Sequence, residues 1–222
     1  MVEFDPERIK KPGREGLAEY FIMRHFSKHI SKFIITKTKI TANQVTAFSL
    51  FLAIISAAFF YLGDYRYLLI GTIVLFISQL IDSCDGEVAR YYGIKSKFGQ
   101  WWDESTDVIK ITFIFFGVSL GLYRTMGSEL PLILGTLAMM NMILFNYIRQ
   151  LTKANVTVAP EAELNVGKKF FFGITVTTIF LVMIFAVINI LYYLLWIYAT
   201  LGFLLWLKKI HTGFKMRDKF AI

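Results

Sequence analysis

The sequence predicts an all-α integral membrane protein with six transmembrane helices and an N-terminal amphipathic juxtamembrane helix. Hydrophobic residues make up 56% of the 222 residues, and the mean hydropathy is +0.55, whereas soluble domains hold about 45–50% apolar residues. The excess gathers in runs close to the ~20 residues that cross a hydrocarbon core. Almost all Lys and Arg residues lie before the first apolar run, in every second connection between runs, or after the last run. Membrane proteins that keep their basic segments in the cytoplasm show this pattern.

Residues 1–40 form the predicted cytoplasmic N-terminal segment. Within residues 18–35, "AEYFIMRHFSKHISKFII", apolar residues recur at mostly helical spacing, and Arg24, Lys28 and Lys32 recur at i, i+4 and i+8. A basic amphipathic helix on the cytoplasmic membrane face explains this pattern, and binding to a calmodulin-like partner is the alternative. The long, mixed and charged sequence before the first apolar run does not resemble a signal peptide.

Residues 41–210 form the predicted six-helix transmembrane domain, and residues 211–222 form a basic cytoplasmic tail. The predicted spans are Asn43–Leu62, Tyr67–Tyr91, Phe98–Leu122, Leu130–Leu151, Lys169–Val187 and Ile190–Leu207. Their connections are short. All four prolines fall outside the span interiors, where a proline would remove a helical hydrogen bond.

The distribution of the 24 Lys and Arg residues predicts the orientation. They concentrate in the N-terminal segment, after the second and fourth spans, and in the tail. Only Arg66 and Arg124 lie at the opposite ends, and Lys110 lies within a span. Both termini of this cell-membrane protein are therefore expected in the cytoplasm, which requires an even number of spans. The net charge of +8 reflects this orientation rather than a nucleic-acid surface, and the single cysteine, Cys84, excludes an internal disulfide.

Six acidic residues interrupt the apolar sequence between residues 80 and 110. Asp82 and Asp85 are three residues apart on one predicted helix, and Asp103 and Asp107 are four apart on the next. Each pair therefore shares a helix face. Because the loop between these helices is short, they are expected to be antiparallel neighbours. Both pairs then lie at similar depth, near the cytoplasmic end.

Four converging carboxylates predict a site for a hard divalent cation. Like charges repel, and buried charge is costly unless it is paired or metal-bound. Oxygen ligands favour Mg²⁺, then Mn²⁺ or Ca²⁺, whereas scattered histidines and a lone cysteine offer no zinc site. Gly86, Ala89 and Gly99 leave room for a ligand or a close helix contact, and Arg90 can bind a phosphate or the acids. Such a set suits phosphoryl transfer.

The remaining charged residues of this stretch are expected to have other roles. Lys110 lies on the face of the second aspartate pair and is expected to neutralise the cluster. Glu87 and Glu104 point away from that face, which predicts solvent or interface contacts. A salt-bridge network between helices is the structural alternative for the four aspartates. The ion path of a cation transporter or channel is the functional alternative, but the outer halves of the spans carry no polar path.

The spacing of the acidic stretch resembles a family signature. It reads Asp82-x2-Asp85-Gly86-x2-Ala89-Arg90-x8-Gly99-x3-Asp103-x3-Asp107, similar to that of the CDP-alcohol phosphotransferases (CDP-alcohol phosphatidyltransferases), membrane enzymes of phospholipid synthesis. Residues 40–46, "ITANQVT", resemble the Thr-Pro-Asn-x-x-Thr entry to that family's first helix. Thr41, Asn43 and Thr46 match, and Ala42 replaces the proline. Six spans and a juxtamembrane helix extend the likeness across most of the chain.

The resemblance implies that an acceptor hydroxyl displaces CMP from a CDP-linked lipid alcohol, with no covalent enzyme intermediate. It makes Asp82, Asp85 and Asp103 metal ligands, and Asp107 a metal ligand, the general base or both. The cofactor would be Mg²⁺, with Mn²⁺ also suitable, and two ions are expected. The CDP moiety would contact residues around the acids, namely Asn43, Thr46, Asp85, Gly86, Ala89, Arg90 and Gly99.

The acceptor would be a phosphate-bearing alcohol, inositol phosphate first and glycerol 3-phosphate next. Cations at the ends of the fourth and fifth spans are expected to bind its phosphate, with ordinary cytoplasmic positive charge as the alternative; these are Arg149, Lys153, Lys168 and Lys169. The basic N-terminal helix with "ITANQVT" resembles the inositol-phosphate branch. The likeness also implies a homodimer, with a CDP-lipid, a soluble alcohol and membrane lipids as partners and no nucleic acid. An inactive nucleotide-binding relative is the last alternative, disfavoured by the intact signature.

Overall fold

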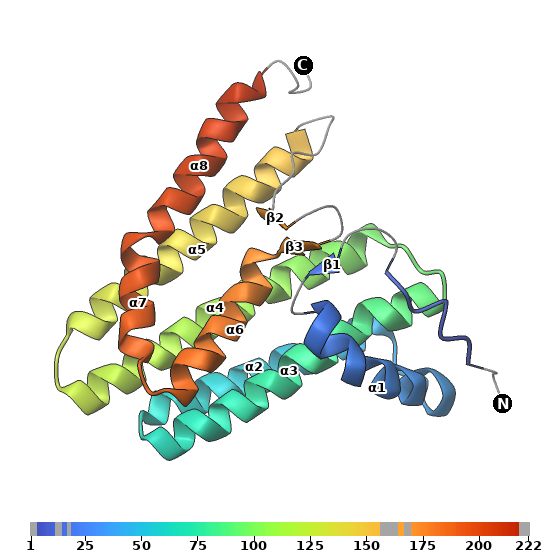
Figure 1. Cartoon of the computed structure of the whole chain (residues 1–222), viewed down its shortest axis with the longest axis horizontal. Helices are drawn as coiled ribbons and strands as arrows, with labels where there is room; N and C mark the ends of the chain where they lie inside the picture. Colours follow the sequence, from blue (N-terminus) through green and yellow to red (C-terminus); the bar gives the residue numbers. More distant parts are fainter. Residues whose placement is uncertain (1–3, 12–14, 17–18, 156–163, 167–169, 218–222) are drawn as a thin grey trace.

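A computed structural model describes the chain apart from residues 1–3, 12–14, 17–18, 156–163, 167–169 and 218–222. The described residues are predominantly helical (Figure 1), which confirms the predicted helical class. A π-helical turn, η1 (Glu19–Met23), leads into the N-terminal helix. The α-helices are α1 (Arg24–Lys37), α2 (Ala42–Leu62), α3 (Tyr65–Tyr91), α4 (Lys97–Met126), α5 (Leu130–Asn155), α6 (Ile174–Val187), α7 (Leu191–Thr200) and α8 (Gly202–Lys215).

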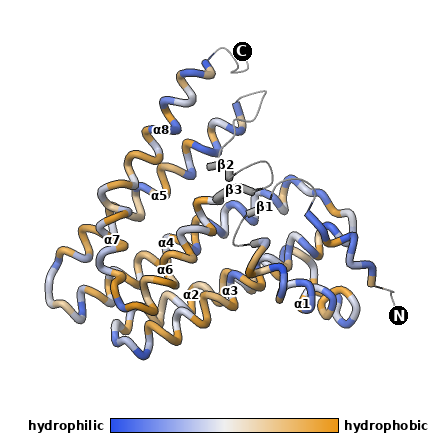
Figure 2. Tube along the Cα trace, viewed as in Figure 1, coloured by the Kyte–Doolittle hydropathy of each residue, from blue (hydrophilic) through white to orange (hydrophobic). Residues whose placement is uncertain are grey.

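The long helices carry the apolar sequence. Each of the first four predicted spans falls within one helix, α2 to α5. These four helices and the combined segment Leu191–Lys215 are long and apolar enough to cross a membrane, and α6 is a shorter apolar helix of 14 residues. Figure 2 shows hydrophobic residues along α2, α3, α6 and α7, and hydrophilic ones near the N-terminus and the free ends of α5 and α8. The count of six spans stays a prediction.

The fifth predicted span begins too early. Helix α6 starts at Ile174 and not at Lys169, because Phe170–Phe172 forms strand β3 instead. This strand pairs in parallel with β1 (Glu15–Gly16) and antiparallel with β2 (Leu164–Val166). An apolar run does not by itself distinguish a short strand from the helix that follows it. The small sheet joins the N-terminal segment to the chain just before α6 (Figure 1).

The sixth predicted span consists of two helices, α7 and α8, with a break between them. Asn141 of α5 lies at the break and donates from Nδ2 to the carbonyls of Tyr198 (3.0 Å) and Ala199 (3.1 Å). Its Oδ1 accepts a hydrogen bond from Trp206 (3.1 Å). A Cβ at Gly202 would approach Asn141 to 2.9 Å. Carbonyls at a helix end need partners in apolar surroundings, and Asn141 supplies them.

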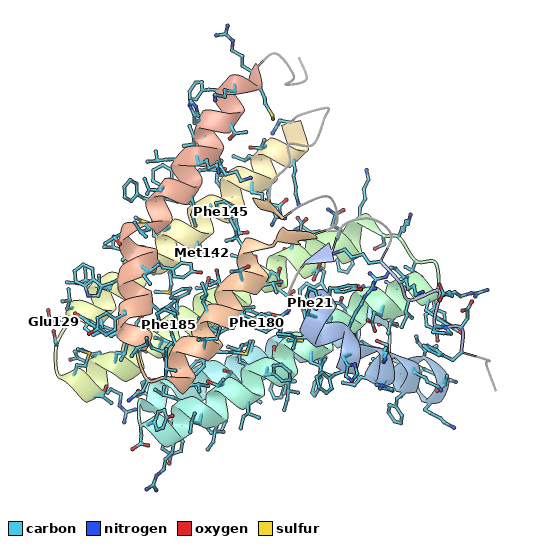
Figure 3. The ribbon with its side chains drawn as sticks, in the orientation of Figure 1. Phe21, Glu129, Met142, Phe145, Phe180 and Phe185 are labelled. Atoms are coloured by element: carbon cyan, nitrogen blue, oxygen red, sulfur yellow. The ribbon has the colours of Figure 1, made fainter. Side chains whose placement is uncertain are left out.

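The main core lies where the long helices meet. Met142 of α5 is buried within it, and Phe180 and Phe185 of α6 pack against it (Figure 3). A smaller cluster at the other end joins α1 to α3 through buried residues, including Ile34, Ile35, Cys84, Val88 and Tyr91. Phe26 and Phe33 of α1 remain 50% and 60% exposed. The position of α1 on a membrane surface stays a prediction.

Two glycines let α4 pack closely against α2. A Cβ at Gly117 would overlap the carbonyl oxygen of Ala57, and a Cβ at Gly121 would overlap that of Phe60. The partner atoms belong to the backbone, so they cannot move without displacing the helix. This contact fixes the relative position of two helices whose N-terminal ends carry signature residues.

Replacement of Gly121 by alanine should therefore destabilise the bundle. The added methyl group would force α4 away from α2, an overpacking that costs about 1–3 kcal/mol. Thermal unfolding of the detergent-solubilised protein, followed by circular dichroism, should show a lower Tm. Gly213→Ala is the control, because a Cβ there meets nothing within 4 Å and alanine favours the helix. Equal Tm values for both variants would show that the α2–α4 contact is not tight.

Candidate active site

Helix α2 begins with a capping box that accounts for "ITANQVT". The N-cap hydroxyl of Thr41 accepts from the backbone N–H of Gln44 (3.4 Å), while the Thr41 N–H donates to Gln44 Oε1 (2.9 Å). Ala42 is therefore the first helical residue, the position at which proline is favoured because its missing N–H would have no helical partner. The capping box starts the helix in the absence of that proline.

Three signature carboxylates from two helices meet at one point. Asp82 and Asp85 come from α3 and Asp103 comes from α4, and each offers one oxygen within 4.8 Å of the others. The expected convergence is present for these three residues. Asp107 lies outside this group but lines a cavity with them.

Two hydroxyl groups of α2 hold the α3 carboxylates in place. Thr46 Oγ1 donates to Asp85 Oδ2 (2.5 Å), and Ser49 Oγ donates to Asp82 Oδ1 (3.0 Å). Both side chains are buried. Ser49 was missed by the sequence analysis, although it lies three residues after Thr46 and therefore on the same helix face.

Lys110 supplies a positive charge inside the cluster. Its ammonium forms an ion pair with Asp82 and lies 4.0 Å from Asp107 Oδ1, and its side chain is 2% exposed. A lysine this deeply buried needs a carboxylate partner, so the expected neutralising role is confirmed. One ammonium does not balance four aspartates. The remaining negative charge and the oxygen-only donor set fit a hard divalent cation.

Two cavities meet at the carboxylates. The first, named the α2 cavity, has a volume of about 700 Å³. Its walls come from α2, α3, α4 and the loop between α3 and α4: Thr41, Ala42, Asn43, Thr46, Asp85, Gly86, Ala89, Ile94, Lys95, Ser96, Lys97, Gly99, Gln100 and Asp103.

The second, named the α1 cavity, has a volume of about 320 Å³. Its walls come from the N-terminal segment and helices α1, α3, α4 and α6: Lys11, Met23, Arg24, Ser27, Gln79, Asp82, Ser83, Asp85, Gly86, Glu87, Arg90, Asp103, Asp107 and Val176. Asp85, Gly86 and Asp103 line both cavities. A group held by the carboxylates is therefore reached from two sides.

The residues expected to contact CDP gather around the α2 cavity. Those in its wall are Asn43, Thr46, Asp85, Gly86, Ala89 and Gly99. Arg90 instead lines the α1 cavity, and its Nε donates to the carbonyl of Ile9 (2.9 Å). A Cβ at Gly99 would lie 3.2 Å from Ser96 Oγ and 3.5 Å from Asn43 Oδ1. The missing side chain thus keeps this part of the cavity open.

The cations expected to bind the acceptor phosphate are only partly placed. Arg149 and Lys153 lie on α5 and are absent from the walls of both cavities. Lys153 Nζ donates to Glu104 Oε1 (3.0 Å), which is the interface contact expected for that glutamate. Lys168 and Lys169 lie outside the described residues.

The α1 cavity contains residues that the sequence analysis did not connect with the site. Glu87 is 3% exposed, and its Oε1 accepts from Ser27 Oγ of α1 (2.7 Å). Its interface contact was expected, but its place in the cavity wall was not. Lys11 and Arg24 were interpreted as cytoplasmic or membrane-facing charge. The sequence shows that α1 has a basic face, but it does not show which other helices this face contacts.

The protein therefore combines apolar helices long enough to cross a membrane with a carboxylate cluster at the junction of two cavities. The chain belongs to the CDP-alcohol phosphatidyltransferase family, whose sequence pattern matches residues 39–207. It is thus a member of a family of integral membrane transferases that act on CDP-linked alcohols.

Curated relatives match parts of the chain. An uncharacterized protein of Aquifex aeolicus is 31% identical over 113 residues, which cover 51% of this chain and 56% of that protein. The bifunctional IPC transferase and DIPP synthase of the same organism is 32% identical, over 48% of this chain and 24% of that protein. Archaetidylinositol phosphate synthase of Pyrococcus horikoshii is 33% identical, over 37% and 42%. The matches thus span from a quarter to just over half of these relatives.

Solved structures share the fold. Phosphatidylinositol phosphate synthase of Mycobacterium tuberculosis with CDP-DAG bound has a TM-score of 0.63 at 18% identity, and the match covers 88% of this chain and 93% of that chain. The same enzyme in complex with manganese and citrate has a TM-score of 0.57 and the same identity, with 87% of each chain covered. At this identity the likeness establishes the arrangement of helices.

Loss of one carboxylate of the cluster should weaken metal binding. Asp103→Asn removes the negative charge of one of the three converging carboxylates. The affinity for Mn²⁺, measured by isothermal titration calorimetry, should therefore fall at least about tenfold. Glu104→Gln is the control, because the neighbouring carboxylate faces Lys153 of α5 and not the cluster. Unchanged Mn²⁺ affinity in Asp103→Asn would remove Asp103 from the ligand set.

Proposed function

We propose that this protein transfers a phosphatidyl-type group from a CDP-linked lipid alcohol to an acceptor hydroxyl and releases CMP. The observation that carries the proposal is the cluster of signature carboxylates at the junction of two cavities. It explains why one site serves two ligands. The names of two similar proteins, archaetidylinositol phosphate synthase and phosphatidylinositol phosphate synthase, support an inositol phosphate as the acceptor, with glycerol 3-phosphate as the next candidate.

The carboxylates of Asp82, Asp85 and Asp103 would hold Mg²⁺ or Mn²⁺. A bound divalent cation would neutralise charge on the diphosphate and stabilise the departing phosphate. Two ions, and a contribution of Asp107 to binding them, are implied by the family resemblance. Thr46 and Ser49 orient the carboxylates through the outer hydrogen bonds that metal ligands commonly need.

The CDP moiety would occupy the α2 cavity. The signature glycines Gly86 and Gly99 line it and leave room for a ligand beside the α3 and α4 backbones. Asn43 lies in the first turn of α2, where N–H groups and the helix dipole favour phosphate oxygens. Most of the residues that line the α2 cavity are uncharged, which suits a pyrimidine ring.

The lipid chains would lie along the seam between α3 and α6. A groove of about 450 Å³ runs there, and it is lined by apolar side chains and one threonine: Thr72, Ile73, Phe76, Phe180, Met183, Ile184, Val187 and Ile188. The α1 cavity ends on the same two helices, at Gln79 and Val176. These two residues lie one helical turn from Phe76 and Phe180. A lipid with its diphosphate at the carboxylates would thus reach the groove directly.

Asp107 would act as the general base. The acceptor oxygen would attack the phosphorus that bears the lipid alcohol, and the bond from that phosphorus to the bridging oxygen of CMP would break. In-line attack places the nucleophile opposite the leaving group. With CMP in the α2 cavity, the acceptor would come from the α1 cavity. Asp107 lines the α1 cavity but not the α2 cavity. Asp107 would take the hydroxyl proton, and no covalent enzyme intermediate is needed.

Three further features remain proposals. The cations Arg149, Lys153, Lys168 and Lys169 would attract the acceptor phosphate to the cytoplasmic face. Positive charge at this face supports an orientation with both termini and the site in the cytoplasm.

The division into residues 1–40, 41–210 and 211–222 is supported by the family match to 39–207, although α8 continues to Lys215. A homodimer rests on the family resemblance.

The purified protein should release CMP when supplied with Mg²⁺, a CDP-lipid and inositol phosphate. Asp107→Asn should lower kcat about 10²- to 10⁴-fold, the usual contribution of a general base. Glu129→Gln is the control, because this residue lies at the turn between α4 and α5, away from the site (Figure 3). Failure of the folded wild-type protein to release CMP with any acceptor would exclude the proposed reaction.

A bulky side chain in the α3–α6 groove should impair use of long-chain substrate. Ile184 is 52% exposed and lines the groove, so Ile184→Trp should raise the KM for a long-chain CDP-lipid roughly tenfold, equivalent to the lost burial of about two methylene groups. The KM for a short-chain analogue should stay the same. The control is Ile197→Trp, at a residue of α7 that is 41% exposed and outside the groove. Equal effects on both substrates would place the chains elsewhere.

A further inference from the structure

One carboxylate in the wall of the α1 cavity is not used by the proposed reaction. Glu87 is 3% exposed, and its Oε1 accepts the hydrogen bond from Ser27. Its other oxygen, Oε2, is buried and has no hydrogen-bond partner among the described residues. A buried charged oxygen without a hydrogen bond is strongly destabilising. Because the Glu87 side chain lines the α1 cavity, a ligand in that cavity would supply the donor that this carboxylate lacks.

The position of Glu87 separates it from the metal site. It follows Asp85 by two residues on α3, and residues two apart lie on different faces of a helix. Ser27 holds the Glu87 carboxylate on the α1 side, and Glu87 is not part of the group formed by Asp82, Asp85 and Asp103. The Glu87 carboxylate therefore calls for a different role from that of the cluster.

Cations share the same cavity. Lys11, Arg24 and Arg90 line it from the N-terminal segment, α1 and α3. The N-terminal segment is fixed there, because Arg90 donates to the carbonyl of Ile9 and Phe4 stacks on Tyr91 at 5.7 Å between ring centroids. Three cations favour an anionic group such as a phosphate.

The requirements of this cavity define a ligand class. Positive side chains suit a phosphate, while Glu87 Oε2 accepts hydrogen bonds and repels a second anion. A volume of about 320 Å³ admits a small molecule. A phosphate monoester with several hydroxyl groups satisfies all three requirements, whereas an alcohol whose single hydroxyl group is the nucleophile leaves Oε2 without a donor.

We propose that Glu87 determines acceptor specificity by accepting a hydrogen bond from a non-reacting hydroxyl group of a polyhydroxylated phosphate monoester. This inference deepens the proposed function and rests on it. The attacking hydroxyl would face Asp107, another hydroxyl would face Glu87, and the phosphate would meet the cations. A site built to bond a substrate hydroxyl rejects analogues that lack it, since its buried polar atom then stays unpaired.

Calorimetric titration tests the inference apart from turnover. Myo-inositol 1-phosphate and 2-hydroxyethyl phosphate are the two probes, titrated into wild-type protein, Glu87→Gln and the control Glu129→Gln in the presence of Mg²⁺ and CMP. Glutamine keeps the shape and can still accept from Ser27, but it replaces one carboxylate oxygen by NH₂ and removes the charge. Glu87→Gln should weaken inositol phosphate binding about 10- to 100-fold and change binding of the second probe less than about threefold.

The outcomes separate specificity from folding and from phosphate binding. Retained Mn²⁺ affinity in Glu87→Gln would confirm an intact site. Equal weakening of both probes, or of neither, would overturn the inference. Arg24→Gln and Lys153→Gln form a second comparison. Arg24→Gln should weaken both probes equally and more than Lys153→Gln does, and the reverse order would overturn the placement of the phosphate in the α1 cavity. Binding of inositol phosphate at Lys153 without any dependence on Glu87 would also refute the proposal.

Activity measurements distinguish this inference from the proposed function. In the CMP-release assay, Glu87→Gln should raise the KM for inositol phosphate and leave the KM for the CDP-lipid within about twofold. CMP release with an unchanged acceptor KM would refute the role of Glu87 and leave the transferase proposal intact. Glu87-dependent binding of inositol phosphate without CMP release from wild-type protein would refute the transferase proposal and support the binding role of Glu87.

Discussion

The candidate active site depends on holding three carboxylate oxygens within 4.8 Å of one another inside an apolar helical bundle. Repulsion between these oxygens would drive flexible segments apart, so the ligands come from the ends of two long helices. The glycine contact fixes one of them, α4, against α2, and α2 also packs against α3. Hydroxyl groups of α2 then orient the acids, and the buried Lys110 balances part of their charge. A divalent cation would complete that balance, and its binding would then be coupled to the packing of the helices.

The second organising feature is the shared wall of the two cavities. Asp85 and Gly86 of α3 face both, so α3 works as a partition with the carboxylates at its edge. Under the proposed function one side would hold the nucleotide, and the other side offers cations, Glu87 and Asp107. An in-line displacement has the same layout, with a nucleophile and a leaving group on opposite sides of phosphorus. The N-terminal segment lines one of these sides through Lys11, and it is held there by Arg90 and by the pairing of β1 with β3.

The sequence predicted those features that repeat at helical spacing. The first four spans and the convergence of Asp82, Asp85 and Asp103 follow from hydropathy, charge and the i, i+3 and i, i+4 rules. Strand β3 could not be separated from α6, because a short apolar run has the same composition in either structure. The wall formed by Lys11 and Arg24 depends on packing between segments far apart in the chain. The pattern placed Glu87 off the aspartate face but could not show that α1 and a cavity lie there.

The α3–α6 groove has a consequence for how this protein meets its substrate. Lipid chains bound in that groove would keep the hydrocarbon of both the donor and the product in contact with the bilayer throughout the proposed reaction. The lipids would then exchange sideways, by two-dimensional diffusion in the membrane, while CMP and the acceptor alcohol would exchange with water. The mole fraction of the donor lipid in the surrounding membrane would accordingly set how much of the site the donor occupies. Dilution of the whole sample would leave that mole fraction unchanged.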